Sequence, residues 1–169
     1  MLEKATRAYN ASLDPATGLY DSQTIRRRIV EEVSRARRYH YPLSLIVTIF
    51  PSPEAWHAED RVQQLAQLLE RHVRTTDILA RFNHSGLVIL LPHTDEAGAR
   101  RLGERVYQLA TVMQLPAGLG GNPAPVHVGV TTVPADYGDG AADLVDTLWE
   151  RLCNEAGDRR GHFTFIALS

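Results

Sequence analysis

The sequence predicts an α/β domain of the α+β kind, in which a mixed five-stranded sheet is flanked by helices. Residues 43–50 form a near-continuous apolar run rich in branched side chains, typical of a central strand covered on both faces. Residues 77–82 and 87–92 are two further apolar runs around the turn residues Asn-His-Ser-Gly at 83–86, which indicates a hairpin. Segments with helical periodicity alternate with these strands, so the expected order is α-β-α-β-β-α-β-α-β.

The chain opens with residues 1–13, which we expect to be a helical lead-in of the kind that follows an upstream domain. Pro15 ends this segment, because proline biases the residue before it away from the helical conformation. The domain itself is expected to span residues 14–169. Its first helix is predicted over residues 22–39, where apolar residues recur at helical spacing after a capped start.

The remaining elements follow from the same signals. Pro51 ends the central strand, and residues 116–125 are rich in glycine and proline and are predicted to form a loop. Besides the hairpin, we predict helices over residues 58–71, from about 95 to beyond 109, and over 141–155, and strands over residues 126–133 and 162–168.

Composition excludes several kinds of partner and chemistry. With 44% hydrophobic residues and a net charge of −2, the 169-residue chain has no overall attraction for nucleic acid or for an anionic membrane. Cys153 is the single cysteine, so neither an internal disulfide nor a cysteine-only metal cluster can form, which fits a cytoplasmic location. No apolar run reaches the roughly 18–20 residues that span a bilayer, so we expect any membrane tether to lie in an upstream region.

Four motifs, through their order and spacing, resemble the GGDEF (diguanylate cyclase) domain. Residues 14–19, Asp-Pro-Ala-Thr-Gly-Leu, stand where the family opens with Asp-x-Leu-Thr-Gly-Leu, and residues 42–45 match its Pro-Leu-Ser-Leu strand. Residues 74–77, Arg-Thr-Thr-Asp, match the Arg-x-x-Asp that precedes the family's signature turn, Gly-Gly-Asp/Glu-Glu-Phe. Residues 91–94, Leu-Pro-His-Thr, match its link into the next helix. The resemblance implies the family's nucleotidyl-cyclase-like fold.

The positions that the family uses for catalysis carry other residues here. The family's reaction joins two GTP molecules, and divalent metal ions neutralise the charge that develops on the phosphates. Ile49 stands where the family has an aspartate that holds the metals. Ser85 and Gly86 replace the acidic pair of the signature turn, and Asn83 and His84 replace its glycines. The resemblance therefore implies a degenerate domain that is not an enzyme, with no catalytic residues, no metal site and no cofactor.

The family's inhibitory site is, in contrast, retained. In the family, Arg-x-x-Asp binds an intercalated dimer of cyclic-di-GMP, and Arg74 and Asp77 occupy these positions. Arg105 matches an arginine that commonly joins from the helix after the hairpin, and Arg101 lies one turn earlier on the same helical face. Arginine pairs with phosphate or with the O6/N7 edge of guanine, and aspartate accepts from guanine N1–H and N2–H. We therefore expect an inactive cyclic-di-GMP receptor.

Two other functions remain open from the sequence. A nucleotide-independent structural module would use the lead-in and Trp56, expected in a loop, to form a homodimer or to dock a partner protein. A GTP sensor would use the remnant of the catalytic cleft. An isolated Arg-x-x-Asp is common and is usually a surface ion pair, so the receptor hypothesis depends on where the motif stands in the domain.

Overall fold

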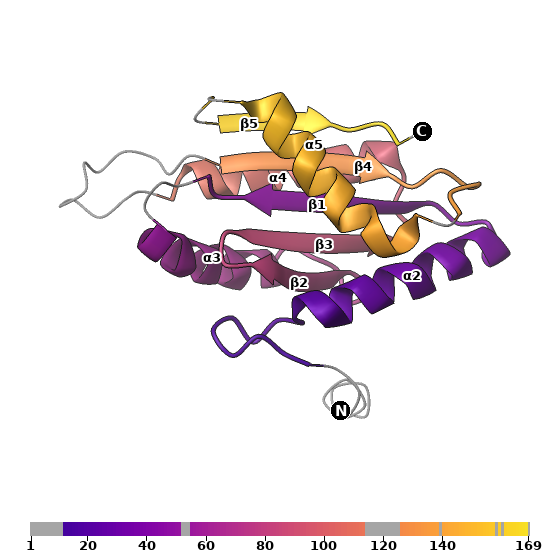
Figure 1. Ribbon diagram of the computed structural model, residues 1–169, viewed down its shortest axis with the longest axis horizontal. Helices are drawn as coiled ribbons and strands as arrows, with labels where there is room; N and C mark the ends of the chain where they lie inside the picture. The colour runs from indigo at the N-terminus through magenta and orange to yellow at the C-terminus, as the bar shows by residue number, and fades with distance from the viewer. Residues whose placement is uncertain are drawn as a thin grey trace.

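The computed structural model describes residues 12–51, 55–113, 126–138, 140–157, 159 and 161–168. The mixed five-stranded sheet flanked by helices is confirmed (Figure 1). Residues 1–11 of the expected lead-in and the expected loop over residues 116–125 lie outside the described residues. The elements are α2 (Ser22–Tyr39), β1 (Leu43–Ile49), α3 (Ala55–Glu70), β2 (Ile78–Asn83), β3 (Gly86–Pro92), α4 (Glu96–Thr111), β4 (Val126–Thr132), the short 3-10 helix η2 (Ala141–Asp143), α5 (Leu144–Ala156) and β5 (Gly161–Phe165).

The sheet has the strand order β2-β3-β1-β4-β5, so the apolar run that forms β1 lies at its centre. β1 pairs antiparallel with both neighbours, which sets Val47 opposite Val88 of β3 and Gly129 of β4. β2 and β3 form the predicted antiparallel hairpin, and β4 and β5 run parallel. The hairpin thus places the signature-turn positions at one end of the sheet, beside the end of β1.

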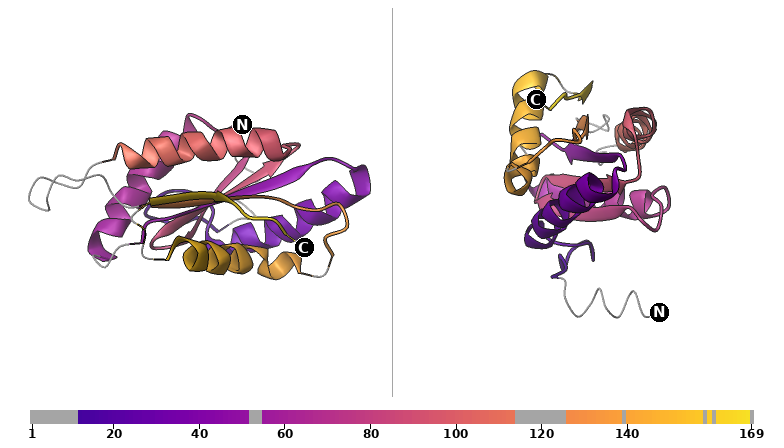
Figure 2. Two further views of the ribbon diagram at one scale, coloured as in Figure 1. Left: turned by 90° about the horizontal axis from the view of Figure 1, so that it is seen from above. Right: turned by 90° about the vertical axis from the view of Figure 1, so that its right-hand side faces the viewer.

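Helices cover both faces of the sheet (Figure 2), with α3 and α4 on one face and α2 and α5 on the other. Successive residues of β1 enter the two cores in turn: Ile46 belongs to the α3–α4 core, whereas Leu45 and Val47 belong to the α2–α5 core. Every residue of β1 is buried. A strand buried on both faces carries mainly apolar side chains, which explains why this run shows no regular alternation of apolar and polar residues.

Helix α2 occupies the predicted residues because both of its ends carry local signals. Asp21 is the N-cap, and its carboxylate accepts a hydrogen bond from the Thr24 backbone N–H at 2.9 Å. Ile25 and Ile29 are fully buried on the inner face. The helix ends at His40, whose φ of 58° lies in the left-handed region.

Three boundaries differ from the sequence-based expectation by more than one residue. Trp56 was expected in a loop, but it lies in α3, which starts at Ala55 because neither glycine nor proline interrupts the chain from there to Glu70. A 3-10 turn occupies residues 141–143 before α5, and β5 ends at Phe165. Among the described residues, no helix is both long enough and apolar enough to cross a membrane.

Candidate functional site

The Arg-Thr-Thr-Asp segment forms a tight turn between α3 and β2. The Asp77 backbone N–H donates to the Arg74 carbonyl at 3.1 Å, and the Arg74 backbone N–H donates to Asp77 Oδ2 at 2.8 Å. These two reciprocal bonds fix the turn and hold the Asp77 carboxylate in place. The Arg74 guanidinium takes no part in them and stays available at the surface.

The Asp77 carboxylate is held in an apolar setting. Its residue is only 8% exposed, and its second oxygen, Oδ1, has no hydrogen-bond partner within the described part of the chain. Burial raises the pKa of Asp77 above its ordinary value, and the hydrogen bond from Arg74 and the charge of Arg74 oppose this effect. A buried acceptor without a partner is uncommon in a folded protein.

The four residues singled out from the sequence lie around one cavity. Its volume is about 230 Å³, and it lies between the Arg74–Asp77 turn and the first half of α4. Arg101 and Arg105 reach it together because they are four residues apart on one face of α4. His72, Thr94 and Gly98 also line the cavity, and no motif in the sequence pointed to them. The complete lining is His72, Arg74, Asp77, Leu91, Thr94, Gly98, Arg101, Leu102 and Arg105.

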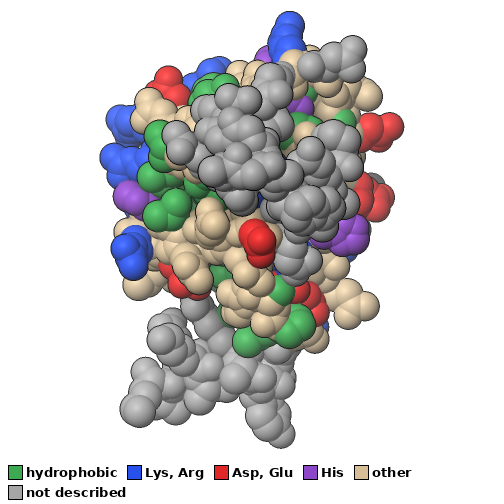
Figure 3. Space-filling model, turned by 90° about the vertical axis from the view of Figure 1, so that its left-hand side faces the viewer, with side chains coloured by type: hydrophobic (Ala, Val, Ile, Leu, Met, Phe, Trp, Pro, Cys, Tyr) green, Lys and Arg blue, Asp and Glu red, His purple; other side chains and the backbone are tan. Residues whose placement is uncertain are grey.

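The three arginines of this cavity are exposed and unpaired. Within the residues that the structure describes, no carboxylate lies within ion-pair distance of the guanidinium of Arg74, Arg101 or Arg105. The neighbouring Arg100 differs, since it bonds Glu96 at 2.8 Å and lies over the ring of Phe165. On the face drawn in Figure 3, the Lys and Arg side chains in view lie mostly along the margin on the α3–α4 side. Three guanidinium groups and a single carboxylate, that of Asp77, line this hollow, and this excess of positive charge favours an anionic ligand.

A larger cavity of about 410 Å³ lies on the other side of the same turn. It is enclosed by residues 13–20, by the end of α3 and by β2. Its walls are mainly leucine and valine side chains, with polar groups toward the turn. The lining residues are Leu13, Gly18, Leu19, Tyr20, Glu70, Val73, Arg74, Thr75, Asp77 and Leu79. Arg74 and Asp77 therefore form part of the wall between the two cavities.

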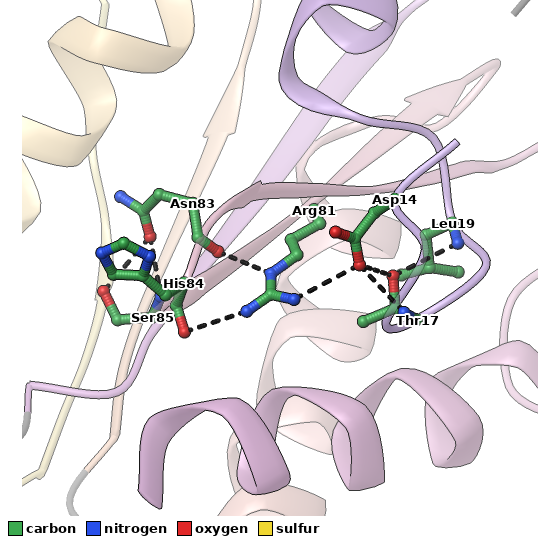
Figure 4. A network of polar contacts seen from close by, with 7 residues as sticks. All are labelled: Asp14, Thr17, Leu19, Arg81, Asn83, His84 and Ser85. Atoms are coloured by element: carbon green, nitrogen blue, oxygen red, sulfur yellow. Dashed lines mark hydrogen bonds and ion pairs between the residues drawn. The ribbon is translucent and has the colours of Figure 1, made fainter. Parts of the chain in front are cut away.

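The segment over residues 12–20 is held against the hairpin by a polar network (Figure 4). The Asp14 carboxylate accepts from the Thr17 backbone N–H at 2.9 Å and from the Thr17 hydroxyl at 2.7 Å. Arg81 of β2 donates to the same carboxylate at 3.3 Å and to the carbonyl of Asn83 at 2.9 Å. Burial raises the pKa of Asp14, but the hydrogen bonds from Thr17 and Arg81 outweigh it and leave the pKa below its ordinary value.

We expect Asp14→Ala to lower the free energy of unfolding by about 2 kcal/mol, since it removes three hydrogen bonds, one of them from the buried Arg81 guanidinium. Because the folded-state pKa of Asp14 is depressed, its stabilisation is present above the ordinary value of 3.8 and is lost as pH falls through the folded value. Urea unfolding across an acidic pH series should therefore show the two proteins converging toward low pH. A constant difference between them would contradict this assignment.

The end of β1 and the hairpin tip are filled by apolar packing. Ile49 is 3% exposed and belongs to the α2–α5 core. A Cβ at Gly86 would lie 2.3 Å from two ring carbons of Trp149, so the indole of α5 already occupies the space beside this glycine. Trp149 also packs on Phe82, with ring centroids 4.9 Å apart. Within the described residues, no three His, Cys, Asp or Glu side chains are arranged to hold a metal ion.

A third cavity, of about 280 Å³, lies beside this hairpin tip. Its lining includes Asp14, Asp21, Ser22 and the hairpin residues 81–84. On the α2–α5 side, the Arg26 guanidinium lies 5.0 Å from the centre of the Phe82 ring and donates to Asp146. Asp21 is already engaged as the cap of α2.

Comparison with known proteins gives one family and a consistent set of structures. A family model described as diguanylate cyclase, GGDEF domain, matches residues 57–159. Among curated proteins, no sequence matches the chain.

The solved structures that resemble the chain share its fold at low sequence identity. The diguanylate cyclase SiaD of Pseudomonas aeruginosa, in complex with its activator SiaC, has a TM-score of 0.79 and 22% identity over 98% of this chain and 66% of that chain. The FimX GGDEF domain of Pseudomonas aeruginosa has a TM-score of 0.75 and 19% identity, over 91% and 99% of the two chains. The GGDEF domain of DgcB from Caulobacter crescentus, in complex with c-di-GMP, has a TM-score of 0.70 and 12% identity, over 90% and 92%. The chain thus spans just under two thirds of the SiaD chain.

Proposed function

The chain belongs to the GGDEF domain family, and from that premise we propose that it is catalytically inactive and acts as a receptor for cyclic-di-GMP. The observation that carries the proposal is the cavity lined by the buried Asp77 and by three arginines, none of which forms an ion pair with another residue that the structure describes. The family's chemistry makes cyclic-di-GMP, so a family member that binds this product without making it would serve signalling.

Catalytic inactivity is supported by the residues that occupy the family's metal-binding positions. Mg²⁺ requires hard oxygen ligands such as carboxylates, and phosphoryl transfer in this family needs such an ion. Ile49 offers only a hydrocarbon side chain that is packed in the core. Gly86 has no side chain, and Trp149 fills the space that an acidic side chain would need. The residues present therefore do not fit a divalent cation, and we derive no catalytic step.

Binding of cyclic-di-GMP is supported by complementary chemistry in the arginine-lined cavity. The ligand carries two phosphates and two guanines. Arg101 and Arg105 supply planar donors for phosphate oxygens, and Arg74 can pair with phosphate or with the O6/N7 edge of guanine. Asp77 lines the same cavity, and a carboxylate accepts hydrogen bonds from the adjacent N1–H and N2–H of guanine. At about 230 Å³ the open cavity accommodates part of the ligand, so the rest would extend over the surface.

A receptor of this kind acts when its bound ligand changes the equilibrium between two states of the protein. A ligand shifts such an equilibrium only through its different affinity for the two states. We propose that bound cyclic-di-GMP, as an intercalated dimer, favours contact with a second copy or with a partner protein. A protein partner has a precedent in the related SiaD, which was solved in complex with its activator SiaC.

Calorimetric titration with cyclic-di-GMP tests the proposal. We expect wild type to bind and Arg74→Ala to bind about tenfold or more weakly, because a charge-assisted hydrogen bond contributes about 1.5–3 kcal/mol. Arg100→Ala is the matched control: it removes an arginine from the same helix as Arg101, but one already paired with Glu96 and outside the cavity. It should bind as wild type does.

Three outcomes would contradict the proposal. Equal affinities for wild type and Arg74→Ala would exclude this cavity as the site. A nucleotide-independent module would be favoured if cyclic-di-GMP does not bind and the molecular mass in solution rises with protein concentration equally with and without cyclic-di-GMP. Tight binding of GTP, titrated in parallel, would favour a GTP sensor.

A further inference from the structure

We propose that strand β5, at the open edge of the sheet, pairs antiparallel with β5 of a second copy of this chain, so that the two sheets join into one. β5 is the last strand in the order β2-β3-β1-β4-β5, and Figure 1 shows it as the outermost strand. The proposal follows from the backbone groups along this edge, the side chains of β5 and the charges beside it. It does not depend on cyclic-di-GMP binding.

The two edges of the sheet differ in how they are covered. At the β2 edge, Tyr20 forms a parallel bridge with Ala80, and the Arg81 backbone N–H donates to the Tyr20 carbonyl at 2.8 Å. The chain thus covers that edge with its own residues. The sequence of β5, Gly-His-Phe-Thr-Phe, contains neither the proline nor the lysine that commonly protect an edge strand. Within the described residues β5 pairs with β4 alone, so its outer edge is open to another strand.

The pairing with β4 determines which backbone groups of β5 face outward. The Ile166 N–H donates to the Val130 carbonyl of β4 at 2.7 Å, so the backbone groups of Ile166 point toward β4. Successive residues of a strand direct their N–H and C=O groups to opposite sides. Gly161, Phe163 and Phe165 therefore direct theirs away from β4, where no other described strand lies. Such a row of backbone groups is a template for a further strand.

A second copy of β5 satisfies these groups in one antiparallel register. When Phe163 lies opposite Phe163 of the second copy, Gly161 lies opposite Phe165, and each facing pair exchanges two N–H···O=C bonds. This arrangement is two-fold symmetric, as a closed homodimer requires. Phe163 and Phe165 are half-buried on the α4 side of the sheet, so pairing covers more of both rings. Aromatic side chains that face each other across two strands stabilise the pairing.

The polar side chains on the α5 side of β5 favour the same register. Glu155 accepts a hydrogen bond from the Thr164 hydroxyl at 2.5 Å and contacts His162 Nε2 at 3.2 Å. Arg159 contacts His162 Nδ1 at 3.0 Å, and both Glu155 and Arg159 are exposed. In the antiparallel register, His162 of one copy lies opposite Thr164 of the other. Arg159 of each copy is thereby brought toward Glu155 of the other, so that charges of opposite sign face each other.

Amide hydrogen exchange of the wild-type chain, followed by NMR without any ligand, tests the proposal. In dilute protein we expect protection to alternate along β5, because β4 protects the amides of His162 and Thr164 but not those of Phe163 and Phe165. At higher protein concentration the amides of Phe163 and Phe165 should exchange about tenfold more slowly once about nine-tenths of the chains are paired. Sedimentation equilibrium of the same samples should show the mass rising from that of a monomer toward that of a dimer.

Phe163→Lys tests the register. It replaces an aromatic pair at the two-fold axis by two like charges that lie opposite each other, so the dissociation constant of the dimer should rise about tenfold or more. Val30→Lys is the matched control, since it adds the same charge at an exposed apolar position on α2, which lies outside β5. This control should associate as wild type does.

Four results would overturn the proposal. The chain could stay monomeric at all concentrations, or dimerise while the amides of Phe163 and Phe165 stay unprotected, which would assign the contact to another surface. Protection of these two amides in the monomer would mean that another segment of the same chain covers the edge. Unchanged association of folded Phe163→Lys is the fourth result. If that variant does not fold, the exchange pattern of the wild type decides alone. Failure of cyclic-di-GMP to bind would leave all these expectations in place.

Discussion

Gly86→Glu is expected to destabilise the domain by about 3 kcal/mol and not to create a metal site. The Cβ alone would lie 2.3 Å from the Trp149 ring and 2.8 Å from the Thr48 carbonyl oxygen, so backbone as well as side chain has to move. The substitution also brings a carboxylate into a buried position, which adds a desolvation cost. For a domain of this size, that corresponds to a fall in melting temperature of about 6–12 °C.

Ser85→Glu is the matched control for this substitution. It introduces the same charge one residue earlier, at a half-buried position whose side chain bonds only Asn83, and should change stability by less than about 1 kcal/mol. Thermal unfolding of both variants measures the difference. The double variant Gly86→Glu with Trp149→Ala should lose less stability than the sum of the losses of the two single variants, since removal of the indole relieves the clash. Additive losses, or a Gly86→Glu protein as stable as wild type, would show that Trp149 does not fill this space.

The contact between Gly86 and Trp149 also shows which kind of structural feature cannot be predicted from the sequence. Helix α2 could be predicted to its ends, because Asp21 caps it locally and its apolar residues have a helical period. The spacing of Trp149 with Val145 and Leu152 on one face of α5 predicts that Trp149 packs on the core, and the half-buried indole does so. Its position against the hairpin tip depends on how α5 crosses the sheet, and no local pattern encodes that.

The candidate site likewise has residues that the sequence singles out and an arrangement that it does not predict. Arg74 and Asp77 stood out because of their position before the signature turn, and Arg101 and Arg105 because of helical spacing. That the four surround one cavity follows only from how α4 packs beside the end of α3. The larger cavity had no signature at all, since it forms where residues 13–20 pair with β2. Its Thr-Gly-Leu sequence indicates a turn but not the surface on which that turn lies.

Asp77→Asn separates the two roles of this aspartate, which are to close the turn and to read a ligand. The amide oxygen can still accept from the Arg74 backbone N–H, so the turn should persist. The substitution replaces one carboxylate oxygen by an amide nitrogen, which donates where a carboxylate accepts. We therefore expect cyclic-di-GMP to bind about tenfold or more weakly in calorimetry. Asp21→Asn is the matched control, since Asp21 likewise holds a backbone N–H but lies outside the arginine-lined cavity.

The stability of Asp77→Asn should move in the opposite direction from its affinity. Burial raises the folded-state pKa of Asp77 above the ordinary value of 3.8. Between these two values the folded state binds more protons than the unfolded state, so the free energy of unfolding of wild type falls as pH rises through this window. Asparagine does not titrate, so the variant should gain stability relative to wild type from about pH 4 toward neutral pH, as measured by urea unfolding at each pH. If the ionised Asp77 carboxylate lowers the stability of the fold, and its replacement by the isosteric amide lowers the affinity for cyclic-di-GMP, then the role of Asp77 is to bind the ligand. Unchanged affinity together with unchanged pH dependence would reduce Asp77 to a turn residue.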